Sequence, residues 1–128
     1  MRALLDTHTF LWWVTDAPQL SDTAKAAIAD PGNLLFLSSA SVWEIVIKVG
    51  TGKLLLPEEP GTYIPSRMAS NRFESLPIQV SHVLQVAKSP DLHRDPFDRI
   101  LVAQSQVEQM PILTIDALIR QYPVTTIW

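Results

Sequence analysis

Short apolar runs alternate along this chain with longer segments whose apolar positions recur at helical spacing. Runs of four or five apolar residues are typical of strands buried on both faces, and the longer segments are typical of helices. We predict strands at 2–6, 34–37, 112–115 and 124–127, and a short edge strand entered through 75–77. Strands that alternate with helices in this way predict a parallel sheet covered by helices on both faces.

Capping and breaking residues set the expected helix ends. Asp6 or Thr7 is suited to cap the helix that follows the first strand, and Ser21 to cap the next. Pro96 stands directly after Asp95, which is the favoured position for proline at a helix start. We predict helices at 7–14, 21–30, 39–49, 62–73, 81–87, 96–109 and 117–120.

Four carboxylates stand at the ends of these predicted elements: Asp6, Glu44, Asp98 and Asp116. In a parallel sheet, strand ends and the starts of the helices that follow them share one edge, and ligands bind at that edge. We therefore expect the four acids to converge. Clustered like charges are unstable without a cation, and a hard ion such as Mg²⁺ (or Mn²⁺) is the natural partner for carboxylate oxygens.

Helix capping is the competing explanation for each acid. Glu44 fits the third helical position of a capping box, and Asp98 fits an acid in a first turn. Asp6 and Asp116 each precede a predicted helix. We assign Asp95 to capping, because proline follows it. Capping does not explain why acids follow both the first and the penultimate buried strand.

Composition limits the class of protein. A length of 128 residues suits a single domain, 1–128, and 47% apolar with 18% charged residues predicts a globular chain. The absence of cysteine excludes disulfides, thiolate catalysis and zinc–thiolate sites. No apolar run approaches the roughly 20 residues of a membrane helix. We expect a cytoplasmic protein with no membrane partner.

The net charge of −3 argues against a conventional basic nucleic-acid binder. If a cation neutralised the four acids, the remaining charge would be +1. Basic residues would then be available to line a phosphate path. They are Lys48, Lys53, Arg67, Arg72, Arg94 and Arg99.

Several segments together resemble the PIN domain, and more narrowly the VapC-type toxins of type II toxin–antitoxin pairs. They are Leu-Leu-Asp-Thr-His at 4–8, Ser-Val-Trp-Glu-Ile at 41–45, Gly-Lys-Leu at 52–54, Asp-Pro-Phe-Asp-Arg at 95–99 and Leu-Thr-Ile-Asp at 113–116. The resemblance covers nearly the whole chain. It implies an α/β protein with a three-layer α/β/α sandwich and a central, mostly parallel, five-stranded sheet.

The resemblance also implies an activity and a set of site residues. The activity is Mg²⁺- or Mn²⁺-dependent endoribonuclease cleavage of transfer or ribosomal RNA. Asp6, Glu44, Asp98 and Asp116 match the family's acidic quartet, with Asp95 as a reserve ligand and Thr114 as the hydroxyl that supports the last acid. The implied partners are an RNA substrate, a small cognate antitoxin and a second copy of the chain.

Further expectations concern RNA and the dimer. Lys48, Arg94 and Arg99 are expected to contact phosphates that flank the cleaved bond. Trp12, Trp13 and the helix at 62–73 are expected at the dimer contact. The alternatives are a non-catalytic module of the same fold that binds RNA or a partner, and a metal nuclease acting on DNA. A dehalogenase-type phosphatase is disfavoured, because it needs an aspartate where this chain has His8.

Overall fold

The computed structural model describes residues 1–90 and 95–128, and its five strands form one sheet in the order β3-β2-β1-β4-β5. Each neighbouring pair in this sheet is parallel. The strands are β1 (Arg2–Leu5), β2 (Leu34–Ser38), β3 (Glu74–Leu76), β4 (Ile112–Leu113) and β5 (Thr126–Ile127). The expected five-stranded parallel sheet is therefore confirmed, with β1 at its centre and β3 at one edge.

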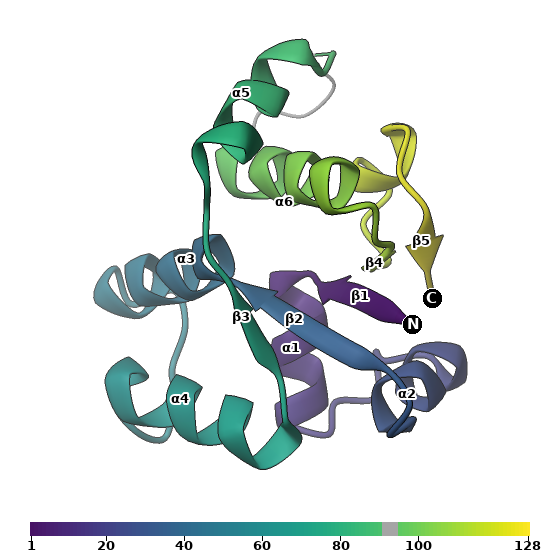
Figure 1. Cartoon of the computed structure of the whole chain (residues 1–128). Coiled ribbons are helices and arrows are strands. Elements are labelled where there is room, and N and C mark those ends of the chain that lie inside the picture. Colours follow the sequence, from purple (N-terminus) through teal and green to yellow (C-terminus); the bar gives the residue numbers. More distant parts are fainter. Residues whose placement is uncertain (91–94) are drawn as a thin grey trace.

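Helices lie on both sides of this sheet (Figure 1). One side carries α5 (Val80–Lys88) and α6 (Pro96–Glu108). The other carries α1 (Thr7–Val14), α2 (Asp22–Ala29) and α4 (Pro60–Asn71). Helix α3 (Ser39–Gly50) contacts both α4 and α6 and so joins the two layers. In the described part of the chain, every helix is too short or too polar to span a lipid bilayer.

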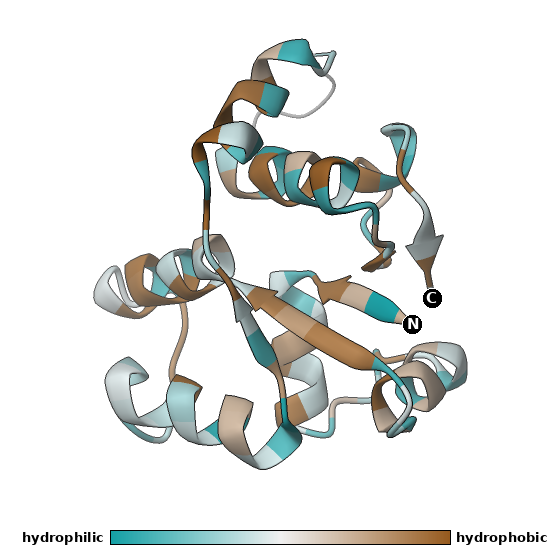
Figure 2. Cartoon of the chain, viewed as in Figure 1, coloured by the Kyte–Doolittle hydropathy of each residue, from teal (hydrophilic) through white to brown (hydrophobic). Residues whose placement is uncertain are grey.

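The central strand supplies side chains to both cores. Ala3 and Leu5 pack with the buried residues of α1 to α4, whereas Leu4 packs with Leu101 and Val102 of α6. This alternation follows from the pleat of a strand, which points successive side chains to opposite faces. Figure 2 shows the apolar strands between the two helical layers. The sheet is therefore a well-packed base for the residues at its ends.

Element boundaries differ from the predicted ones by a few residues. Helix α4 starts at Pro60 rather than at 62, because proline is suited to a first helical turn. The last helical segment is a 3₁₀ turn, η1 (Ile119–Gln121), rather than a helix at 117–120. Strands β4 and β5 are two residues each, because only these residues pair with neighbouring strands.

Candidate functional site

The four acids stand at the carboxyl edge of the sheet. Asp6 follows β1, Glu44 lies in the helix that follows β2, and Asp116 follows β4. Asp98 lies in the first turn of α6, whose chain returns across the sheet into β4 and which therefore starts at the same edge. Strands β1 and β4 are neighbours, yet the chain leaves them toward opposite sides of the sheet. Such a switch point opens the crevice in which α/β proteins bind ligands.

Asp6 is a buried carboxylate with a partner on each oxygen. Its Oδ1 accepts the backbone N–H of Thr9 at 2.8 Å, so Asp6 is the cap of α1. The hydroxyl of Thr114 donates to its Oδ2. Burial raises the pKa of Asp6 above its ordinary value, and the hydrogen bonds from Thr114 and Thr9 and the nearby His8 offset this only in part. An adjacent cation would offset the free-energy cost of this buried negative charge.

Thr114 links two of the acids. Its hydroxyl donates to Asp6 and accepts the backbone N–H of Asp116 at 3.0 Å. The Asp116 side chain also stabilises the 3₁₀ turn that follows it, because its Oδ1 accepts the N–H groups of Leu118 and Ile119 at 2.8 and 3.1 Å. Neither of these bonds uses Oδ2 of Asp116. The ends of β1 and β4 are thus joined through one buried hydroxyl.

Glu44 does not form the expected capping box. Helix α3 begins directly after Ser38, whose side chain caps it, so Ser41 is already inside the helix and Glu44 lies in the second turn. Glu44 is buried, and its Oε2 lies 3.0 Å from Nζ of Lys48. Its Oε1 is also buried and has no hydrogen-bond partner among the residues that the structure describes. Capping therefore does not account for this acid.

A pair of hydroxyls connects the turn that carries Glu44 to the end of β1. Thr7, the residue after Asp6, donates to the side chain of Ser41 at 2.9 Å, and both are buried. Ser41 stands one helical turn before Glu44 and so lies on the same face of α3. The sequence analysis did not single out this pair. Its only signal is the presence of small hydroxyl residues in segments that are otherwise apolar.

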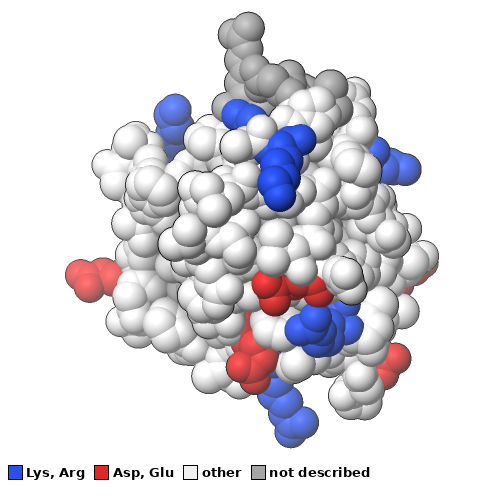
Figure 3. All heavy atoms as spheres, turned by 45° about the horizontal axis from the view of Figure 1, so that its top comes forward, with Lys and Arg blue, Asp and Glu red and all other residues white. Residues whose placement is uncertain are grey.

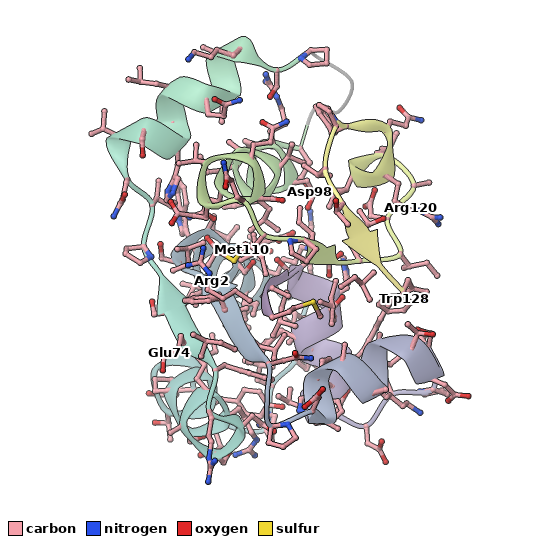
Figure 4. All side chains as sticks on the ribbon, turned by 45° about the vertical axis from the view of Figure 1, so that its right-hand side comes forward. Arg2, Glu74, Asp98, Met110, Arg120 and Trp128 are labelled. Carbon is pink, nitrogen blue, oxygen red and sulfur yellow. The ribbon has the colours of Figure 1, made fainter. Side chains whose placement is uncertain are left out.

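The start of α6 completes this edge. Asp95 caps the helix by accepting the N–H of Phe97 at 2.9 Å, which confirms its predicted capping role. The Phe97 ring meets the ring of Trp43 edge-on at 5.2 Å, which fixes α6 against α3. Glu44 and Asp95 both line a pocket of about 280 Å³ between these helices. Asp98 projects from the first turn of α6, on the side of the C-terminal segment (Figure 4).

The donors suit a hard cation, but they do not form a finished cage. The described residues contain no group of three acidic or histidine side chains that could hold an ion together. Hydrogen bonds join Asp6, Thr114 and the backbone of Asp116. The Thr7–Ser41 hydrogen bond connects the end of β1 to the helix that carries Glu44. The buried, unpartnered Oε1 of Glu44 is the atom that most clearly needs a further partner. Convergence of the whole quartet on one ion stays a prediction.

The basic residues expected at RNA phosphates have different surroundings. Lys48 is paired with Glu44, and Arg99 lies in the first turn of α6. Arg94 lies outside the described residues. On the face drawn in Figure 3, acidic and basic side chains form small groups among uncharged ones rather than one basic band. A nucleic acid at this face would therefore meet isolated cations.

These features define an α/β protein with acidic residues at the carboxyl edge of a parallel sheet, beside its switch point. Residues 3–124 match the PIN domain family. Because this match covers most of the chain, the protein belongs to the PIN domain family.

A relative with local sequence similarity is consistent with this membership. A stretch of 58 residues is 41% identical to Ribonuclease VapC16 of Mycobacterium tuberculosis, and it covers 45% of this chain and 40% of that protein. The chain thus matches less than half the length of this relative.

Solved structures share the fold. The VapBC2 complex of Rickettsia felis, bound to a DNA fragment from its promoter, superposes with a TM-score of 0.72 at 14% identity, over 98% of this chain and 97% of that one. FitAcB of Neisseria gonorrhoeae gives 0.63 at 17% identity, over 97% and 95%. At these identities the comparison speaks for the fold alone, and it confirms the expected three-layer PIN-like architecture.

Proposed function

We propose that this protein is a metal-dependent endoribonuclease and the toxin of a type II toxin–antitoxin pair. The observation that carries the proposal is the carboxyl edge of the sheet, where the Thr114 hydroxyl bonds both the Asp6 side chain and the Asp116 backbone. At the same edge, one buried oxygen of Glu44 has no hydrogen-bond partner among the described residues. Membership of the PIN domain family and local similarity to a protein named as a ribonuclease support the same chemistry.

The proposed metal ligands are Asp6, Asp98 and Asp116, with Glu44 beside them. A divalent cation held by these carboxylates would neutralise the charge of the scissile phosphate and acidify an attacking water. Thr114 fixes the Asp6 carboxylate through its hydrogen bond and so keeps Oδ2 in place. Oε1 of Glu44 is suited to accept a hydrogen bond from the attacking water or to join a second ion.

Substrate and partners are part of the same proposal. Lys48 and Arg99 would contact phosphates of a structured RNA such as transfer or ribosomal RNA, and Arg94 is proposed beside them from its sequence position alone. Two similar structures are those of VapBC2 and FitAcB, and we propose a cognate antitoxin as the partner of this chain. We also propose that two copies of the chain form a homodimer.

Cleavage assays with matched variants test this function. Purified protein should cut structured RNA when Mg²⁺ or Mn²⁺ is present and should stop when the ion is chelated. Asp6→Asn should lower the rate by about a hundredfold or more, because a metal ligand is lost while the size of the side chain is kept. The control Asp22→Asn removes an exposed carboxylate of α2 and should cleave like the parent.

The alternatives have distinct outcomes in the same assays. A DNA nuclease would cut single- or double-stranded DNA of matched sequence faster than RNA. A non-catalytic module would bind RNA but cleave neither substrate with either ion, and calorimetry would detect no binding of Mg²⁺ or Mn²⁺. Equal RNA cleavage by the parent and Asp6→Asn would overturn the proposed active site.

A further inference from the structure

Glu44 and Lys48 form an ion pair at the edge of the proposed metal site. The Lys48 ammonium lies 3.0 Å from Oε2 of Glu44, one helical turn away on α3. The Glu44 side chain is 7% exposed and the Lys48 side chain 34% exposed, so the carboxylate is buried while its partner reaches solvent. The other carboxylate oxygen, Oε1, is buried without a hydrogen-bond partner among the described residues.

Only one of the two oxygens of this buried carboxylate has a partner among the described residues. A buried charge is stable when it has a counter-ion and hydrogen bonds on its remaining lone pairs. Lys48 supplies the counter-ion on Oε2, and the described residues supply nothing on Oε1. The ammonium is compact, carries a single charge and sits on a flexible stem, so a divalent cation at the same carboxylate can displace it.

The space next to the pair allows such a displacement. Lys48 and Glu44 line the pocket of about 280 Å³ between α3 and the start of α6. Lys53, Thr51 and Phe97 line it as well. The Lys48 side chain can therefore leave Oε2 and remain in a partly polar pocket without entering the apolar core. Lys53 provides a second lysine in the same pocket, which is useful as a control.

We propose that Lys48 is the resident counter-ion of Glu44 and competes with the divalent cation for this carboxylate. The inference rests on the proposed metal-dependent function. In the ion-free protein Lys48 keeps the buried Glu44 charge neutralised, and ion binding moves its ammonium into the pocket, where we expect a substrate phosphate. Lys48 thus sets the ion concentration at which the Glu44 side of the site fills.

A calorimetric titration with Mn²⁺ as the only added ligand tests whether Lys48 and the ion compete for Glu44. Lys48→Met removes the charge and keeps an apolar stem of similar length. It should bind Mn²⁺ about tenfold more tightly than the parent, within the usual range for coupled neighbouring sites. Lys53→Met, the control, should change the affinity by less than about threefold, because an exposed charge is screened by salt.

A measurement on the parent protein keeps the test independent of variant folding. Acetylation by an amine-reactive reagent, read by mass spectrometry, should be faster at Lys48 when Mn²⁺ is added, with no matching change at Lys53. An unchanged or weaker Mn²⁺ affinity in Lys48→Met, or an unchanged Lys48 acetylation rate in Mn²⁺-saturated parent protein, would overturn the competition. Absence of any Mn²⁺ binding by the parent would overturn the proposed metal-dependent function and this inference with it.

Discussion

Asp6 combines a structural and a proposed chemical role in one side chain. It caps α1 through Thr9, and it is buried at the edge of the sheet where β1 and β4 end. A cap keeps its hydrogen bond whether the side chain is an acid or an amide, but only the acid carries the charge. Capping and ion binding are therefore compatible explanations, and substitution separates them.

The raised pKa of Asp6 predicts a particular pH dependence of stability. Below its ordinary pKa of 3.8 the carboxyl is protonated in both folded and unfolded chains. As the pH rises, the unfolded chain loses this proton first, so the ion-free protein loses stability until the pH passes the folded-state pKa. The amide of Asp6→Asn does not ionise, so this variant should be more stable than the parent at neutral pH, although it should no longer cleave RNA.

Urea unfolding at a series of pH values above 3.8 measures this difference. The stability advantage of Asp6→Asn should grow with pH and then level off, and Mn²⁺ should reduce it by stabilising the parent alone. An advantage that is constant with pH would contradict the desolvation argument.

Thr114 gives a second prediction at the scale of one residue. Thr114→Val keeps the shape of the side chain but removes the hydroxyl that holds Asp6 and accepts the Asp116 N–H. Ion affinity and RNA cleavage should fall by about ten- to a hundredfold, as is usual when the support of a metal ligand is removed. Thr114→Ser retains the hydroxyl and should restore most of both. Equal values for the two variants would show that the hydroxyl is not needed.

At the level of secondary structure, two nearby aspartates at the start of α6 have different roles. Asp95 stands before the helix and caps it through the N–H of Phe97. Asp98 stands in the first turn and belongs to the proposed ligand set. Asp95 lines the pocket between α3 and α6, whereas Asp98 projects on the side of the C-terminal segment (Figure 4). A change in one aspartate should therefore affect stability, and a change in the other should affect activity.

Paired substitutions distinguish the cap from the ligand. Asp95→Ala should cost about 1 kcal/mol of stability, the usual value for a lost helix cap, whereas Asp95→Asn should keep the cap and most of the activity. Asp98→Asn should lower RNA cleavage by about a hundredfold, because a proposed metal ligand is lost. Chemical denaturation and initial cleavage rates measure the two effects. Loss of activity in Asp95→Asn with retention in Asp98→Asn would reverse the assignment.

At the scale of the whole molecule, an apolar face remains outside the two cores. Val80, Val83 and Leu84 of α5 are 75%, 53% and 61% exposed, and Trp43 of α3 is 59% exposed. The apolar segments of α5 are visible in Figure 2. Trp43 and Val83 line a hollow of about 260 Å³ with Ile78, Phe97 and other apolar residues. Contiguous exposed apolar surface of this kind is typical of an interface.

The tryptophans expected at the dimer contact are engaged within the chain. Trp13 Nε1 donates to the Asn71 side chain at 2.9 Å, and the Trp12 ring packs against Trp128 at a centroid distance of 5.9 Å. Both residues are partly buried. The dimer and its predicted contact at Trp12, Trp13 and the helix at 62–73 stay predictions. The apolar face of α3 and α5 is a second surface on which we expect a contact between copies.

Light scattering coupled to size-exclusion chromatography tests this contact. The parent should elute as a dimer, and Val83→Asp should shift it to a monomer, because a charge would be buried at the contact. Leu55→Asp places the same charge on a residue that is 90% exposed in a loop and should leave the dimer intact. A monomeric parent, or a Val83→Asp variant that remains dimeric, would contradict the expected interface.

The sequence by itself determined the order and type of most elements and the positions of the acids along them. Short continuous apolar runs, capping residues and breakers are local signals. They predicted the parallel sheet, the Ser21 cap and a cap at Asp6 or Thr7, of which the structure has Asp6. The four acids were placed at strand and helix ends for the same reason. Local signals do not reach across the chain, however. The capping box suggested by Ser41 and Glu44 shows how a plausible motif can mislead, because Ser38 caps α3 and Ser41 already lies inside the helix.

Which of these residues meet depends on how the elements are arranged in space. The Asp6–Thr114 bond joins residues 108 positions apart, and the Thr7–Ser41 bond joins residues 34 positions apart. Both depend on the order of strands in the sheet, which no local pattern specifies. Burial likewise raised the pKa of Asp6, because desolvation depends on neighbours from several elements at once. It also left one oxygen of Glu44 without a hydrogen-bond partner among the residues that the structure describes.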